Sequence, residues 1–200
     1  MKKNLVFIVR RGDLEFYWIA PVIKYLKRKF NIYIFFLNKK SFDNLNMSNT
    51  AVKYVMKNVS NYFVYRVYYK IVEKILFSLF IFFFNKKKFT KTNNFFLNKI
   101  HNYYFIKKKL KISGNIDLIL SEYSIRTEWL KQIHKENKTK IVHYPNSPQI
   151  FMKKNINPKR LVGDKLIINS KLELNYWKKN ISKNKIFPVG SPQHDRWWLN

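Results

Sequence analysis

The sequence predicts an α/β fold: a doubly wound, mostly parallel Rossmann-like sheet with an additional helical, basic and aromatic insertion. Three observations lead to this class. Short continuous apolar runs, typical of strands buried on both faces, recur along the chain. Segments with helical spacing separate most of these runs. A long middle region without Gly or Pro interrupts the alternation.

The first forty residues read as one strand–helix–strand unit. Residues 4–9, NLVFIV, predict a buried strand, and residues 10–16, RRGDLEF, predict a turn. Residues 17–30 place their apolar side chains at helical spacing, with Pro21 in an early turn where it is tolerated. Residues 31–38, NIYIFFLN, predict a second strand. Such a unit implies parallel pairing and a right-handed crossover.

The alternation returns after residue 115. Helices are expected over residues 124–136 and 172–180, and four further strands over residues 116–122, 139–144, 164–170 and 185–189. With the first two, six strands alternate with helices, which favours a doubly wound sheet.

The insertion covers about residues 44–112. Between Asn44 and Ile116 stand fourteen Lys or Arg and a single acid, Glu73, and residues 50–111 lack Gly and Pro, which indicates helix. The uncharged run 75–84 would span about 15 Å as a helix, roughly half a bilayer core. Two interpretations of residues 67–84 stay open. They form either a buried helix on the sheet or a monotopic membrane contact flanked by lysine clusters at 86–88 and 107–109.

Composition narrows the class further. The net charge is +29, and part of the lysine excess matches the codon bias of an AT-rich genome. The scarcity of acids is not explained by that bias, so we expect attraction to anionic membrane surfaces. Nucleic acid is an unlikely partner, because the aromatic residues cluster in apolar runs such as FSLFIFFF. Without cysteine, and with histidines not at zinc spacing, no metal or other cofactor is expected.

The ends of the predicted strands carry the candidate site. Ligands of open parallel sheets bind at the carboxyl ends of the strands, and polar residues gather there. Glu122 and His143 are the candidate catalytic residues, as carboxylate base and as the easiest proton acceptor near neutral pH. The candidate substrate-binding residues are Arg11, Gly12, Asp13, Glu15, Ser121, Arg126, Asn146, Ser147, Ser170, Gly190 and Ser191. This edge suits a hydroxyl-rich ligand.

Each candidate also has a structural interpretation. Asp13 and Ser170 would cap the helices that follow them, and Glu122 would pair with Arg126 in the next helical turn. His143 would be a packed strand residue. The first turn lacks GxGxxG and the chain has no GxxxxGK[ST], so no motif indicates hydride or ATP chemistry.

Four segments, NIDLILSEYSIRTEWL, KIVHYPNSP, DKLIINSKLELNYWKK and KIFPVGSPQHDRWW, follow one another in an order that resembles a known class. They resemble the N-terminal half of GT-B glycosyltransferase-like proteins of surface polysaccharide synthesis, including capsule and CDP-glycerol glycerophosphotransferase-type proteins. Gly190, Pro192 and Asp195 match the loop that closes the first domain of such proteins, and Asp164 with Ser170 match the strand before it. The chain departs from the pattern at Asn146, where the class has histidine, and at Ser147, where it has glycine.

The resemblance implies a domain organisation and an activity. Residues 1–190 would form the acceptor-side domain, and residues 191–200 a linker or the start of a second domain that holds the donor nucleotide. The whole enzyme would move a glycosyl or glycerophosphate group from a nucleotide-activated sugar or CDP-glycerol to a polysaccharide or lipid-linked acceptor. The chain alone would then not turn over. The apolar run at residues 5–9 is too short for a secretory leader, so we expect a cytoplasmic location, peripheral on the inner face of the membrane.

Two other classes stay open. One is a non-catalytic, membrane-peripheral scaffold that serves as the partner of another chain, which the departure at Asn146 and Ser147 favours. The other is a basic nucleic-acid-binding module, which a steep salt dependence of binding to single strands would indicate.

Overall fold

The computed structural model describes residues 2–10, 12–37, 39–64, 112, 114–122, 130, 138–144, 163–179 and 181–192, apart from the side chains of Asp13 and Leu14. Within these residues, seven strands form one sheet in the order β3-β2-β1-β4-β5-β6-β7, and all neighbouring strands are parallel. The strands are β1 (Lys3–Val9), β2 (Phe30–Phe36), β3 (Asn61–Val64), β4 (Leu118–Glu122), β5 (Lys140–Tyr144), β6 (Lys165–Ile168) and β7 (Ile186–Pro188). The predicted doubly wound α/β class is confirmed.

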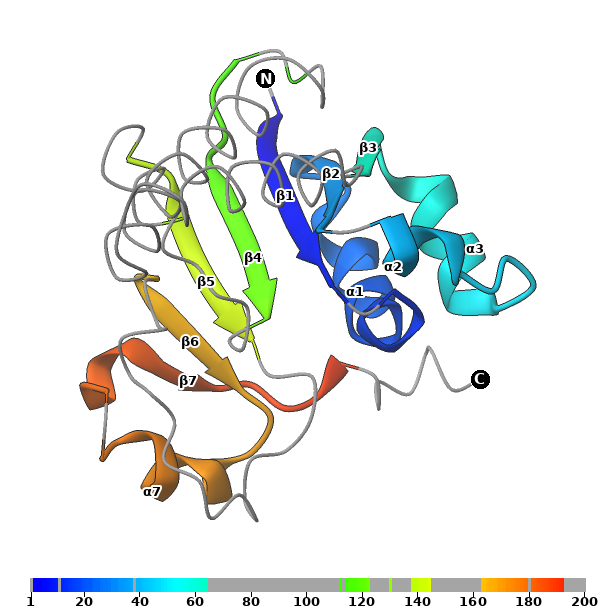
Figure 1. Ribbon diagram of the computed structural model, residues 1–200. Coiled ribbons are helices and arrows are strands. Elements are labelled where there is room, and N and C mark those ends of the chain that lie inside the picture. The colour runs from blue at the N-terminus through cyan, green and yellow to red at the C-terminus, as the bar shows by residue number, and fades with distance from the viewer. Residues whose placement is uncertain are drawn as a thin grey trace, which may run out of the picture.

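Helices connect the strands on the right-hand side of Figure 1 and below β6. The described helices are α1 (Asp13–Leu26), α2 (Lys39–Asp43), α3 (Thr50–Asn58), η3 (Lys171–Glu173), α7 (Leu174–Trp177) and η4 (Lys183–Lys185), of which η3 and η4 are 3₁₀ helices. Helices α1 and α3 pack against each other. No helix in the described part of the chain is long and apolar enough to span a bilayer.

Six of the strands lie where the apolar runs predict them, and two details differ. Residues 61–64, expected to be helical, form β3, which pairs in parallel with β2 at the edge of the sheet. Helix α1 begins at Asp13, four residues before the expected start at Tyr17, because the presumed turn after Gly12 already has helical geometry. Of the predicted helix 124–136 only Leu130 is described, and it is helical. Residues 67–84 lie outside the described residues.

The core has a layer on each face of the sheet. Alternate residues of β1 point to opposite faces: Leu5, Phe7 and Val9 pack with α1 and α3, and Val6 and Ile8 pack in a second cluster that includes Leu130. All five side chains are fully buried, as the unbroken apolar run of this strand requires. A third cluster joins β6, β7 and α7 around the buried indole of Trp177.

All seven strands run in the same direction, so their carboxyl ends lie at one edge of the sheet and their amino ends at the other (Figure 1). The chain leaves β1 toward β2 on one side, whereas β4 begins the half of the sheet that continues to β5, β6 and β7. The junction of β1 and β4 is therefore the topological switch point, where open parallel sheets of this kind bind ligands.

Candidate functional site

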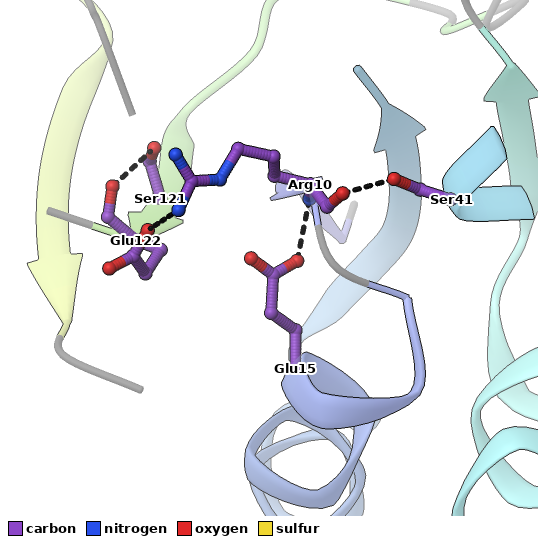
Figure 2. Close-up of polar contacts among 5 residues, drawn as sticks. All are labelled: Arg10, Glu15, Ser41, Ser121 and Glu122. Carbon is purple, nitrogen blue, oxygen red and sulfur yellow. Dashed lines mark hydrogen bonds and ion pairs between the residues drawn. The ribbon is translucent and has the colours of Figure 1, made fainter. Parts of the chain in front are cut away.

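Arg10 links three elements at the carboxyl ends of β1 and β4 (Figure 2). Its backbone N–H donates a hydrogen bond to Oε2 of Glu15 in α1, with 2.7 Å between the nitrogen and the oxygen. Its guanidinium lies 3.5 Å from Oε2 of Glu122 at the end of β4. The hydroxyl of Ser41 in α2 donates to its carbonyl oxygen. The ends of two strands and the starts of two helices are thus held together by one residue.

The two carboxylates of this group are buried, and the guanidinium is accessible. Glu15 is 0% exposed, and the side chain of Glu122 is 3% exposed against 34% for that of Arg10. Burying a carboxylate is expensive unless it is paired or hydrogen-bonded, and Arg10 supplies a partner to each of them. The side chain of Arg10 is therefore the part of this group that solvent reaches.

Gly12 makes this geometry possible. Its φ is +63°, a conformation that L side chains rarely adopt, and a Cβ there would lie 2.6 Å from the carbonyl oxygen of Ser41. Its own carbonyl oxygen accepts hydrogen bonds from the backbone N–H groups of Glu15 and Phe16, at 3.1 and 3.3 Å. The glycine therefore turns the chain sharply from β1 into α1 and brings Glu15 back under Arg10.

A stacked aromatic pair lies against the carboxylates. The rings of Trp18 and Tyr144 are 4.1 Å apart between centroids, with 11° between their planes. Complete burial, followed by the negative charges of Glu15 and Glu122, raises the pKa of Tyr144 well above its ordinary value, so the phenol stays neutral. Among the described residues, neither its hydroxyl nor the indole N–H of Trp18 has a hydrogen-bond partner.

Strand geometry separates the two candidate catalytic residues. Ser121 pairs in register with His143 and Glu122 with Tyr144, and successive side chains of a strand point to opposite faces. Tyr144 packs in the cluster that faces α1, and Ile141 packs in the opposite one. Glu122 therefore lies with Tyr144 on the α1 side, and His143 lies on the other face. The two do not form a pair.

His143 is held by a neighbouring backbone. Its Nε2 accepts a hydrogen bond from the N–H of Gly163 at 3.1 Å, and the residue is 1% exposed. Burial lowers its pKa from 6.5 to about 4, with a smaller opposing effect from the backbone of Ser121. The imidazole is neutral near pH 7, and the Nε2 lone pair is already used. A Cβ on Gly163 would lie 2.8 Å from the imidazole Cδ2, so the approach requires glycine.

The remaining candidates are distributed along the edge. Ser121 is buried, and its hydroxyl donates to the carbonyl oxygen of Glu122 at 3.3 Å. Ser170 caps η3, since its Oγ accepts from the N–H of Leu172 at 3.0 Å, as the structural interpretation expects. Gly190 and Ser191 follow β7, three strands from β4, which is about 14 Å at ordinary strand spacing. Only Gly12, Glu15, Ser121 and Glu122 among the described candidates therefore gather at the switch point.

Sequence reasoning missed Arg10 and chose its neighbour Arg11, which the structure does not describe. Both follow the first strand, and nothing in the sequence distinguishes them. Among the described residues, Glu122 forms an ion pair with Arg10. Its expected pairing with Arg126 stays a prediction. Arg11, Arg126, Asn146 and Ser147 lie outside the described residues, as does the side chain of Asp13.

Several solved structures share this architecture. The apo form of the lipopolysaccharide outer core galactosyltransferase WaaB matches 94% of this chain at 14% identity, with a TM-score of 0.55. A UDP-N-acetylglucosamine 2-epimerase matches 96% at 11% identity with a TM-score of 0.52, and S. aureus MnaA in a co-structure with UDP matches 95% at 12% identity with a TM-score of 0.51. No family model and no curated protein sequence matches the chain.

The chain spans less than half of each of these three structures: 45%, 49% and 44% of their lengths. It has the fold of one Rossmann-like half of a GT-B protein, as fits an N-terminal domain. The resemblance inferred from the four sequence segments is confirmed at the level of the fold.

Proposed function

We propose that this chain is the acceptor-side half of a GT-B-type transferase. The whole enzyme would move a glycosyl or glycerophosphate group from a nucleotide-activated donor to a surface polysaccharide or lipid-linked acceptor. The observation that carries the proposal is the Arg10–Glu122 ion pair at the β1/β4 switch point, with Glu15 behind it. The fold shared with the galactosyltransferase WaaB supports it.

Glu122 is the proposed base. Transfer to an acceptor hydroxyl requires that its oxygen bond to the donor carbon or phosphorus while its proton leaves and the nucleotide departs with the electrons of the broken bond. A carboxylate at the carboxyl edge of the sheet can accept that proton. Arg10 orients this carboxylate, and its partly exposed guanidinium would also hydrogen-bond the acceptor.

The donor nucleotide would bind to a second domain, for which residues 191–200 would be the linker. UDP is present in the co-structure of MnaA, which supports a nucleotide-activated donor. A diphosphate leaving group needs positive charge or hydrogen-bond donors to stabilise it, and these would come from that second half. We further propose that the protein works at the inner face of the cytoplasmic membrane, in keeping with its net charge of +29.

Acceptor binding by the purified chain tests this proposal. Saturation-transfer NMR would compare a lipopolysaccharide core oligosaccharide and a glycerol-phosphate oligomer with UDP and CDP as ligands. We expect saturation transfer to the oligosaccharide or to the glycerol-phosphate oligomer. We expect no transfer to the free nucleotides, because the nucleotide site would belong to the other half. Binding of nucleotides alone would refute the acceptor-side assignment.

A pair of variants localises the site. Glu122→Gln should weaken oligosaccharide binding, whereas Glu173→Gln should leave it unchanged. Glu173 is a suitable control because it is also buried, but it lies between β6 and α7 and accepts the indole N–H of Trp177 at 3.3 Å. Equal loss in both variants would show that burial of a carboxylate, and not its position at the switch point, is responsible.

A further inference from the structure

The amino edge of the sheet, opposite the candidate site, is lined with cations. Lysines and arginines occupy the first position of a strand, or the few residues before it, in β1, β2, β3, β5, β6 and β7. We call this set the basic rim: Lys2, Lys3, Lys27, Arg28, Lys29, Lys57, Lys138, Lys140, Lys165, Lys183 and Lys185. Because every strand is parallel, these residues lie at one edge although they come from distant parts of the sequence.

The basic rim faces solvent and is not neutralised by the described part of the chain. All of its side chains are exposed except Lys27, which is half-buried. The two acids beside it are Asp117 and Asp164, and both bind backbone. Asp117 accepts the N–H of Asn4 at 2.7 Å, and Asp164 accepts that of Ile141 at 3.1 Å. The two ion pairs seen among the described residues, at Glu122 and Asp43, lie at the other edge.

The carboxyl edge of the sheet carries basic and acidic residues together. Its described cations are Arg10, Lys39, Lys40 and Lys171, and its described acids are Glu15, Asp43, Glu122 and Glu173. Codon bias toward lysine acts on the gene without regard to where a residue falls in the fold. It therefore cannot explain why one edge is basic and the other mixed.

We propose that the basic rim docks the protein onto an anionic phospholipid surface. The rim is as broad as the seven-stranded sheet, about 29 Å at ordinary strand spacing, so its cations can meet several headgroups at once. Lysines and arginines near an anionic leaflet each add to binding. Tyr25, 58% exposed in the last turn of α1, adds an amphipathic ring beside Arg28.

A membrane fits these residues better than a nucleic acid does. Single strands bind where bases can stack on open aromatic rings. Two aromatic rings next to the rim are occupied by its own lysines: Lys27 lies 5.5 Å from the ring centroid of Tyr54, and Lys165 lies 4.6 Å from that of Phe187. Tyr25 is an exposed ring near the rim.

This proposal rests on the membrane location proposed above, not on the transferase activity, and it adds an orientation. Docking by the amino edge directs the Arg10–Glu122 group away from the lipid. Strands of five to seven residues separate the two edges by roughly 17–23 Å at about 3.3 Å per residue. An acceptor would then react at a group that stands well clear of the headgroups.

Vesicle flotation with charge-matched variants tests the rim. The rim variant carries Arg28→Gln, Lys29→Gln and Lys140→Gln. The control variant carries Lys39→Gln, Lys40→Gln and Lys171→Gln, which removes the same charge from exposed positions at the carboxyl edge. Affinity is measured for vesicles of phosphatidylglycerol and phosphatidylcholine and for pure phosphatidylcholine. A single-stranded oligonucleotide serves as a second polyanion, and circular dichroism confirms folding.

We expect the wild-type chain and the control variant to float with the anionic vesicles and not with the neutral ones. The rim variant should bind anionic vesicles on the order of 100-fold more weakly, since each cation near the surface contributes about a factor of five. Equal loss in both variants would show a response to net charge alone and overturn the proposal. So would a rim variant that keeps vesicle affinity and loses only oligonucleotide affinity, or a wild type that does not float. Should the rim variant fail to fold, the single reversals Arg28→Glu and Lys171→Glu replace the pair.

Discussion

The guanidinium of Arg10 lies 3.5 Å from the carboxylate of Glu122, and this ion pair joins the carboxyl ends of β1 and β4. At the opposite edge, the side chain of Asp117 accepts the backbone N–H of Asn4, a residue 113 positions earlier in the chain. Replacing Arg10 with Met should destabilise the chain by about 1–3 kcal/mol. This is below the value for a fully buried pair, because the arginine is a third exposed. Denaturant unfolding measures the change.

A double-mutant cycle separates the pair from other effects of these substitutions. Combined with Glu122→Gln, which removes the buried charge and retains the shape, Arg10→Met should cost less than it does alone. Strict additivity of the two substitutions would show that the ion pair contributes nothing to stability.

The chain should tolerate replacement of Glu15 by a residue that also accepts a hydrogen bond better than replacement by Ala. Its Oε2 receives the backbone N–H of Arg10, and Gln can offer a carbonyl oxygen at the same place. Glu15→Ala leaves that N–H without its acceptor in a buried location and should cost about 1–3 kcal/mol, and Glu15→Gln should cost less. Equal losses in thermal unfolding of the two variants would contradict this role for the hydrogen bond.

His143 should make the chain sensitive to mild acid. Its pKa is about 4 in the folded chain against 6.5 ordinarily, so below pH 6.5 the unfolded chain binds a proton that the folded chain refuses. Stability is complete above pH 6.5 and falls as the pH drops toward 4, by about 3 kcal/mol in total at 1.36 kcal/mol per unit. Unfolding free energies measured between pH 7 and 4 give the slope.

His143→Gln supplies the matched variant for that slope. It retains an acceptor for the N–H of Gly163 and removes the titration, so the dependence on pH should flatten. An unchanged slope would assign it to other groups. In the complete transferase that we propose, the same variant would test the prediction that His143 is a base, since it would then cut turnover without melting the fold.

Gly12 and Gly190 offer a comparison between two glycines of positive φ, +63° and +89°. Alanine is strained at both positions, at about 1 kcal/mol. At Gly12 the added Cβ would also clash with the carbonyl oxygen of Ser41 at 2.6 Å, whereas at Gly190 no atom of the described residues lies within 4 Å. Gly12→Ala should therefore be the more damaging by about 1–3 kcal/mol. Similar melting temperatures for both variants would argue against a constrained turn.

The sequence predicts strands well where an unbroken apolar run marks them. Unbroken apolar runs such as NLVFIV predict strands buried on both faces, and β1 has that environment. The four residues NYFV of β3 carry no Gly or Pro boundary, so pairing with β2 decides their conformation. The Gly12–Asp13 pair indicates a turn and gives no sign that α1 begins there.

The sequence predicted which strand ends carry the candidate site. It did not predict how the side chains at those ends are arranged. Polar residues after β1 and β4 do meet at the switch point, as the topology requires. The contact of Arg10 with Glu122 depends on how the chain turns after β1 and on the neighbouring position of β4. The separation of Glu122 from His143 depends on the register between β4 and β5. Both require strand pairing that the order of elements does not supply.

The position of β1 between β2 and β4 also sets the order in which the chain can fold as it is synthesised. β1 finds its first partner, β2, within the first 36 residues, whereas its other partner, β4, begins at Leu118. Throughout the synthesis of the residues between, one side of β1 has unpaired amide and carbonyl groups, and such an open edge is prone to associate with other chains. Ribosome-bound intermediates shorter than about 120 residues would be the species that chaperones must protect, and the Arg10–Glu122 contact would report the end of that interval.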